Sequence, residues 1–170
     1  MTSLAPHAFP NATLALRYND ANDGDFGVEC LKLGAEEFSY ALGKGGSTRK
    51  KLAKASGCIL EYIGETAFMA GSKAERGRAR DYLTWLLQQR TGSVNATAEG
   101  RDDVLVMPVP SETVGFLTGS KGQSLRQVEH ESGTFCFADT SGGEHLAENI
   151  LIFSCKESRR RNAEVRLQTG

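Results

Sequence analysis

Two short stretches of the sequence, Gly43-Lys44-Gly45-Gly46 and Gly119-Ser120-Lys121-Gly122, share the pattern Gly-x-x-Gly and begin 76 residues apart. Each is followed by a run of helical character that closes on Ser-Gly, and the closing glycines, Gly57 and Gly133, are also 76 residues apart. Because the spacing is the same at both ends, the sequence indicates a duplicated structural unit. This repeat determines how the rest of the chain is interpreted.

The residues around each loop predict the same order of elements twice. An opening strand is predicted at 28–33 and again at 104–109, and a two-turn helix at 35–42 or 111–118 then runs into the loop. Because both opening strands are rich in apolar residues, both are expected to be buried. A second helix begins after the loop at Ser47 or Gln123 and ends at the closing glycine.

Two further strands and a helix complete each repeat. The strands are predicted at 58–63 and 67–71 in the first repeat, and at 134–139 and 149–154 in the second. The first closing helix is marked by five apolar residues at helical spacing: Ala79, Tyr82, Leu83, Leu86 and Leu87. The second, within 156–168, has mainly Ala163 and Leu167 on one face, so fraying is expected there. The connection at 140–148 contains Ser141-Gly142-Gly143 and is predicted to be a mobile loop.

Length and composition agree with two small domains. The chain has 170 residues, of which 39% are apolar, enough for two modest cores in domains of about 65 residues each. The predicted organisation is a polar lead-in at 1–27, domains at 28–90 and 103–168, and a flexible linker at 91–102 rich in Gly, Ser, Thr, Asn and Ala. Residues 13–18 of the lead-in suggest one extra strand.

Several classes of function lack a signal in the sequence. The four cysteines include no Cys-x-x-Cys pair and the three histidines show no metal-ligand spacing, so no metal or other cofactor is expected. Neither glycine loop continues as a nucleoside-triphosphate loop, and no catalytic set is visible, so the protein is predicted not to be an enzyme. The N-terminus resembles neither a signal peptide nor a membrane span. A soluble intracellular protein, cytoplasmic or nuclear, is expected.

The order strand, helix, Gly-x-x-Gly, helix, strand, strand, helix resembles the type I KH (K-homology) RNA-binding domains in both repeats. The stretch from Val109 to Gly122, Val-Pro-Ser-Glu-Thr-Val-Gly-Phe-Leu-Thr-Gly-Ser-Lys-Gly, follows the family pattern closely. The resemblance implies an α+β protein with two type I KH domains (β-α-α-β-β-α), each a three-stranded antiparallel sheet packed on three helices. It covers about residues 28–90 and 103–168.

A Gly-x-x-Gly loop between two helices suits a sugar-phosphate backbone. No side chain stands in the way at either glycine, and the following helix presents unpaired N–H groups and its positive dipole end to the phosphates. In KH domains about four nucleotides then lie in a groove between the two helices and the second strand. The resemblance therefore implies non-catalytic binding of single-stranded RNA, in post-transcriptional RNA regulation or processing. Single-stranded DNA is an acceptable substitute, because no residue identifies a 2′-hydroxyl contact.

The resemblance and the local charge together give the candidate nucleic-acid-binding residues. The resemblance places the phosphate-facing loops at Gly43, Lys44, Gly45, Gly46 and at Gly119, Ser120, Lys121, Gly122. It lines the first groove with Leu42, Arg49, Leu52 and Leu60, and the second with Thr118, Leu125, Val128 and Cys136. Arg49 and Thr118 depart from the family, which has aliphatic residues at those positions, so the base preference is not predicted.

Local charge separates the two repeats. The stretch 43–54 has five basic residues and no acid, which adds Lys50 and Lys51 to the candidates, and the first repeat is expected to bind more strongly. The second repeat adds Arg126 but sets it and Lys121 against Glu129 and Glu131. Two alternatives stay open. In the first alternative, the lysines after the first loop form an ordinary solvated helix face. In the second, the whole chain is a protein-interaction scaffold with weak or no nucleic-acid binding.

Overall fold

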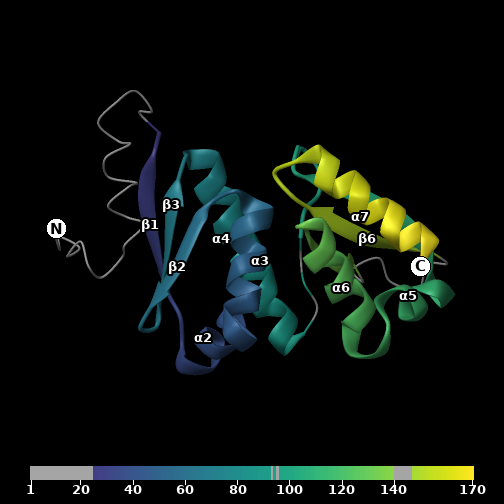
Figure 1. Ribbon diagram of the computed structural model, residues 1–170, viewed down its shortest axis with the longest axis horizontal. Coiled ribbons are helices and arrows are strands. Elements are labelled where there is room, and N and C mark those ends of the chain that lie inside the picture. Colours follow the sequence, from purple (N-terminus) through teal and green to yellow (C-terminus); the bar gives the residue numbers. More distant parts are fainter. Residues whose placement is uncertain (1–24, 93, 95, 140–146) are drawn as a thin grey trace. The chain divides into compact units, whose positions relative to one another are not determined.

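The computed structural model describes residues 25–92, 94, 96–139 and 147–170, and the chain divides into two compact units. Unit 1 comprises residues 1–87 and unit 2 residues 88–170. The described residues form an α+β structure with six α-helices and two three-stranded antiparallel sheets (Figure 1). The strand suggested at 13–18 and the mobile loop predicted around Ser141-Gly142-Gly143 lie outside the described residues.

The described part of unit 1 has the element order that the repeat pattern predicts. Its elements are β1 (Gly27–Lys32), α2 (Ala35–Leu42), the 3-10 turn η1 (Lys44–Gly46), α3 (Ser47–Ser56), β2 (Ile59–Ile63), β3 (Thr66–Gly71) and α4 (Lys73–Thr91), whose last residues continue past the unit boundary at residue 87. The sheet order is β1-β3-β2, with Leu31 opposite Ala67 and Leu60 opposite Met69. Figure 1 shows α3 and α4 on one side of this sheet. In the order β1-β3-β2, the strand β2 is an edge strand, and it lies beside α3.

Unit 2 has the same element order. Its elements are β4 (Val104–Pro110), α5 (Ser111–Thr118), the 3-10 turn η2 (Ser120–Gly122), α6 (Gln123–Ser132), β5 (Phe135–Asp139), β6 (Ala147–Phe153) and α7 (Glu157–Thr169). The sheet order is β4-β6-β5, so β5 takes the edge place that β2 has in unit 1. Helix α7 extends to Thr169, and two of its three apolar residues, Ala163 and Leu167, are buried in the core of the unit, while Val165 is 56% exposed.

The opening strands are less buried than their apolar sequences led us to expect. All six residues of β1 are partly or fully exposed, and in β4 only Met107 and Val109 are buried, while Val106 is 43% exposed. The reason is their place at a sheet edge, whereas the central strand β6 has buried residues on both faces, from Ile150 to Phe153. An apolar run marks a strand but does not say whether it is central.

The duplication extends to individual hydrogen bonds. The buried hydroxyl of Ser56 donates to the carbonyl of Leu52 at 2.7 Å, and the hydroxyl of Ser132 donates to the carbonyl of Val128 at 2.5 Å, so both second helices end in the same way. At the start of the last helix, Arg76 donates to Gly71 O at 3.0 Å and Arg160 donates to Ser154 O at 2.7 Å. Each arginine ties its helix to the end of the preceding strand.

The contrast between central and edge strands gives a stability test in unit 2. Replacing Ile152, which is fully buried on β6, with alanine should lower the free energy of unfolding by about 2–5 kcal/mol, because it leaves a cavity. Val106→Ala on the edge strand is the control and should cost less than about 1 kcal/mol. Urea unfolding followed by circular dichroism measures both, and equal losses would contradict the assigned core.

Candidate nucleic-acid interface

The two glycine loops have nearly the same backbone conformation. The first glycine has φ 72° and ψ 172° at Gly43, and φ 74° and ψ 177° at Gly119. The third position has φ 63° at Gly45 and 53° at Lys121, and the fourth has 76° at Gly46 and 73° at Gly122. Three of the four positions thus lie at positive φ in both loops. Lys121 shows that the fold imposes this conformation even where the residue is not glycine.

Close packing fixes the first glycine of each loop. A Cβ atom added at Gly43 would lie 2.9 Å from the backbone nitrogen of Thr48, and one added at Gly119 would lie 3.0 Å from that of Ser124. The side-chain oxygens of Thr48 and Ser124 would be closer still. The first glycine is therefore required for two reasons, its positive φ and the chain packed against it.

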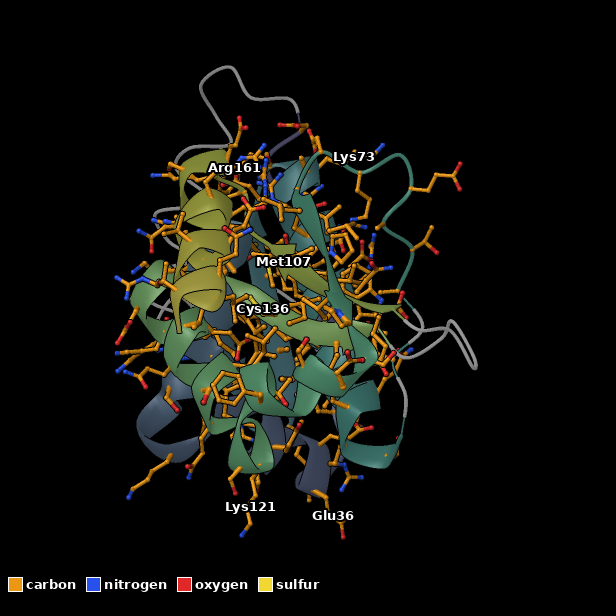
Figure 2. All side chains as sticks on the ribbon, turned by 90° about the vertical axis from the view of Figure 1, so that its right-hand side faces the viewer. Glu36, Lys73, Met107, Lys121, Cys136 and Arg161 are labelled. Atoms are coloured by element: carbon orange, nitrogen blue, oxygen red, sulfur yellow. The ribbon has the colours of Figure 1, made fainter. Side chains whose placement is uncertain are left out.

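The middle of each loop, in contrast, is open. A Cβ atom added at Gly45, Gly46 or Gly122 would meet nothing within 4 Å, and Lys44, Gly45, Ser120 and Lys121 are exposed. The last glycine donates its N–H back to the first glycine's carbonyl, at 3.2 Å in unit 1 and 3.1 Å in unit 2. The N–H groups at the start of such a turn have no partner within it, so they face a ligand or water. Figure 2 shows Lys121 extending away from the ribbon.

Basic side chains follow the loop of unit 1 along α3. Arg49, Lys50, Lys51 and Lys54 come from this helix, with Lys50 and Lys54 exposed and Lys51 half-buried. In unit 2 the corresponding helix α6 exposes Arg126, but it also carries Glu131, whose carboxylate pairs with Arg166 of α7. The loop of unit 1 therefore begins a more positive helix than the loop of unit 2 does.

The side chain of Arg49 reaches from the first turn of α3 to the edge strand β2. Its Nη1 donates to the carbonyl of Leu60 at 2.9 Å and lies 3.5 Å from Oε1 of Glu61. Beside this contact, the hydroxyl of Tyr62 donates to the carbonyl of Ala41 at 3.2 Å. Burial of the Tyr62 side chain raises its pKa. These two bonds join β2 to both helices that flank the loop.

Unit 2 closes the same place with the opposite chemistry. The residue 76 positions after Arg49 is Leu125, which is buried in the core. The residue 76 positions after Leu60 is Cys136, whose backbone N–H donates to Oε2 of the buried Glu129 at 2.9 Å. In unit 1 the guanidinium of Arg49 donates a hydrogen bond to a carbonyl of the edge strand. In unit 2 the side chain of Glu129 accepts a hydrogen bond from an N–H of the edge strand.

Four of the predicted groove residues lie inside the protein, contrary to the expectation from the sequence. Leu52 and Leu60 are 0% and 1% exposed, and Leu125 and Cys136 are buried in the core of unit 2. Figure 2 shows Cys136 within the body of its unit. Leu60 and Cys136 belong to the edge strands, and Leu52 and Leu125 belong to α3 and α6. All four side chains are part of the core, so they support the surface from beneath. The remaining wall residues are half-buried: Leu42, Arg49, Thr118 and Val128.

Sequence reasoning missed three features near the loops. Thr48 and Ser124, five residues after the first glycine, pack against it, and their shared small hydroxyl side chains were the available signal. Glu129 gave no signal, because its partner is a backbone group. Phe116 on α5 is 73% exposed and borders two hollows of about 390 and 290 Å³, and Tyr40, its counterpart on α2, is also exposed.

The thiols form no disulfide. None of Cys30, Cys58, Cys136 and Cys155 is bonded to another cysteine, and burial raises the pKa of Cys58 to about 12. Within the described residues, no three or more His, Cys, Asp or Glu side chains are placed together to hold a metal ion. In the same part of the chain, no helix is both long and apolar enough to cross a membrane.

Comparison with known proteins yields likenesses among solved structures. No family model and no curated protein matches the chain. Dim2p from Pyrococcus horikoshii matches with a TM-score of 0.35 at 14% identity, covering 84% of this chain and 89% of that one. The a/eIF2alpha-aDim2p-rRNA complex from the same organism matches with 0.37 at 13%, covering 90% and 88%. A protein of unknown function from Aeropyrum pernix matches with 0.34 at 11%, covering 85% and 84%. At such scores these likenesses do not decide the function.

The crowding at the first loop glycine gives a second stability test. Gly43→Ala should lower the free energy of unfolding by about 2 kcal/mol or more, because the positive φ and the contact with Thr48 both oppose a side chain. Gly64→Ala is the matched control, since Gly64 also has positive φ but has nothing within 4 Å of an added Cβ. The control should lose only the conformational part, about 1 kcal/mol. Equal losses in urea unfolding would show that the contact has no energetic effect.

Proposed function

We propose that the chain is a pair of type I KH-like modules that bind single-stranded RNA without catalysis. The observation that supports this most is the doubled loop, in which the same three positions have positive φ and the same main-chain atoms are open to solvent. Each loop stands between two helices and beside an edge strand, which is the arrangement the KH pattern needs.

The physical basis of binding is main-chain contact with phosphate, reinforced by local positive charge. The open loop admits the sugar-phosphate backbone, and the first N–H groups of η1 and α3 point toward it with the positive end of the helix dipole. Lys44 and Lys50 are exposed on either side of Gly45 and Gly46 and add long-range attraction. Unit 1 is proposed as the stronger site, and unit 2 as the weaker one.

Two modules on one chain suit a polymer ligand. Even weak sites gain about 10² to 10⁴ in avidity when both engage one strand. The end of the segment between α4 and β4 is held to the end of β6, since the N–H of Ser154 donates to the carbonyl of Asp103 at 3.0 Å and the guanidinium of Arg101 lies 5.7 Å from the centroid of the Phe153 ring. We place the protein in RNA regulation or processing inside the cell, in the cytoplasm or nucleus, with single-stranded DNA as a substitute ligand.

A protein-interaction scaffold is the second candidate, and one observation favours it. Phe116 is largely exposed and lies between two hollows lined mainly by α5, α6, α7 and β4 of unit 2. An exposed aromatic beside hollows is a common anchor for a protein partner. The amount of nucleic acid that copurifies with the protein, measured by its absorbance at two ultraviolet wavelengths, would separate the two candidates.

Substitution of the loops tests RNA binding directly. Lys44→Asp with Gly45→Asp, and Ser120→Asp with Lys121→Asp, place acidic side chains where phosphate is proposed to lie. The combined variant should bind random-sequence RNA at least about tenfold more weakly, as repulsion replaces attraction. Fluorescence anisotropy gives the affinity and circular dichroism confirms the fold.

A charge-matched control separates the loop from overall charge. Lys73→Asp with Ala74→Asp makes the same change of charge as the unit 1 loop variant, at the exposed start of α4. The control should bind RNA far more tightly than the Lys44→Asp, Gly45→Asp variant does. Unchanged affinity in the folded combined loop variant would rule out the proposed site.

The salt dependence of binding tests the role of Lys44 as a phosphate contact. Lys44→Ala should reduce the slope of the logarithm of the binding constant against the logarithm of salt concentration by about 0.7. The slope is measured by anisotropy titrations over a series of salt concentrations, with Lys73→Ala as the reference variant. A slope that stays at the wild-type value would remove Lys44 from the phosphate contacts.

A further inference from the structure

The guanidinium of Arg49 is held beside the loop of unit 1 at one nitrogen. Nη1 makes both contacts to β2, the hydrogen bond to Leu60 O at 2.9 Å and the approach of 3.5 Å to Glu61 Oε1. The side chains of Arg49 and Glu61 are 22% and 29% exposed, so the pair lies at the surface of the edge strand. Arg49 comes three residues after Gly46, which places this pair next to the open loop.

The contacts to β2 leave the other edge of the guanidinium accessible, since neither Nε nor Nη2 is among the described nitrogens that are both buried and unpaired. An arginine has five N–H donors in a rigid planar fork. Among the contacts of Arg49 within the described residues, Nε and Nη2 are not used. These two nitrogens donate side by side and nearly parallel, so they match a ligand with two adjacent acceptors.

The position of this fork is set before any ligand arrives. Leu60 O belongs to a strand residue that is 1% exposed and pairs with Met69 of β3, so the acceptor that holds Nη1 is itself fixed. A side chain already ordered loses little freedom on binding. This favours a directional contact over a diffuse attraction.

The carboxylate of Glu61 argues that the fork contacts a base and not a phosphate. It lies 3.5 Å from Arg49 and offsets its charge, and it would repel a phosphate brought to the same place. A neutral base edge meets no such repulsion. Cytosine presents N3 and O2 as adjacent acceptors and guanine presents O6 and N7, whereas adenine and uracil have no two acceptors side by side.

We propose that Arg49 makes unit 1 selective for cytosine or guanine, through a two-donor hydrogen bond to the base edge. This inference rests on the proposed RNA binding and names the base class that the same site takes. Unit 2 cannot make this contact, because Leu125 stands at the equivalent position and is buried. Selectivity of this kind therefore belongs to unit 1 alone.

The test compares four labelled RNA octamers of repeating UC, UG, UA and U, titrated by fluorescence anisotropy at one salt concentration. The full-length protein should bind the UC or the UG octamer about tenfold more tightly than the UA and U octamers, the discrimination expected of one bidentate contact. The two favoured octamers also show which of the two bases the site takes.

The variant Arg49→Lys keeps the charge and removes the fork. The affinities of this variant for the UC and UG octamers should fall until they are about equal to its affinity for the UA octamer. Arg161→Lys, on the exposed face of α7, is the matched control and should keep the wild-type preference among the four octamers. Thermal unfolding of each variant is recorded as well, because a merely structural Arg49 would change stability and leave the ratio between RNAs unaltered.

The outcomes separate this inference from the proposed function. Wild-type protein that binds all four octamers equally, or Arg49→Lys that keeps the preference, overturns the role of Arg49 and leaves RNA binding intact. Wild-type protein that binds none of the octamers overturns both. A preference for the UC or UG octamer that disappears only in Arg49→Lys supports the inference.

Discussion

The tight approach of the chain to itself at the first loop glycine is the constraint on which the proposed site depends. Thr48 or Ser124 packs so closely that no side chain fits, and the glycine takes a positive φ that turns the first helix into the second. This turn brings the start of the second helix beside the exposed peptide groups of the loop. Without it there would be two helices and a flexible connection, with no ordered set of donors.

The repeat could be derived from the sequence because it depends on residues with strong local preferences. The glycines that end α3 and α6 have φ values of 75° and 72°, and each lies where a helix stop was expected. Closing helices were also found where apolar spacing indicated them. Such features depend on neighbours in sequence, so a single chain carries the information.

The chemistry of the edge strands could not be derived in this way. Arg49 and Leu60 are eleven residues apart and meet through a backbone carbonyl, which leaves no mark on residue type. Leu60 and Cys136 were expected to line the binding grooves because of the family resemblance, which does not say how deeply each side chain is buried in this chain. The opening strands were expected to be buried because they are apolar, but an apolar sequence does not tell whether a strand is central or at a sheet edge.

The buried contact between Glu129 and the N–H of Cys136, set against that between Arg49 and the carbonyl of Leu60, has a consequence for the molecule as a whole. The backbone repeats, yet the matching edge-strand residues Leu60 and Cys136 are contacted by a helix arginine in unit 1 and by a helix glutamate in unit 2. A chimaera built from two copies of one half would keep the architecture and lose one of these two polarities. The duplication is therefore one of backbone architecture, while the side chains that contact the two edge strands differ.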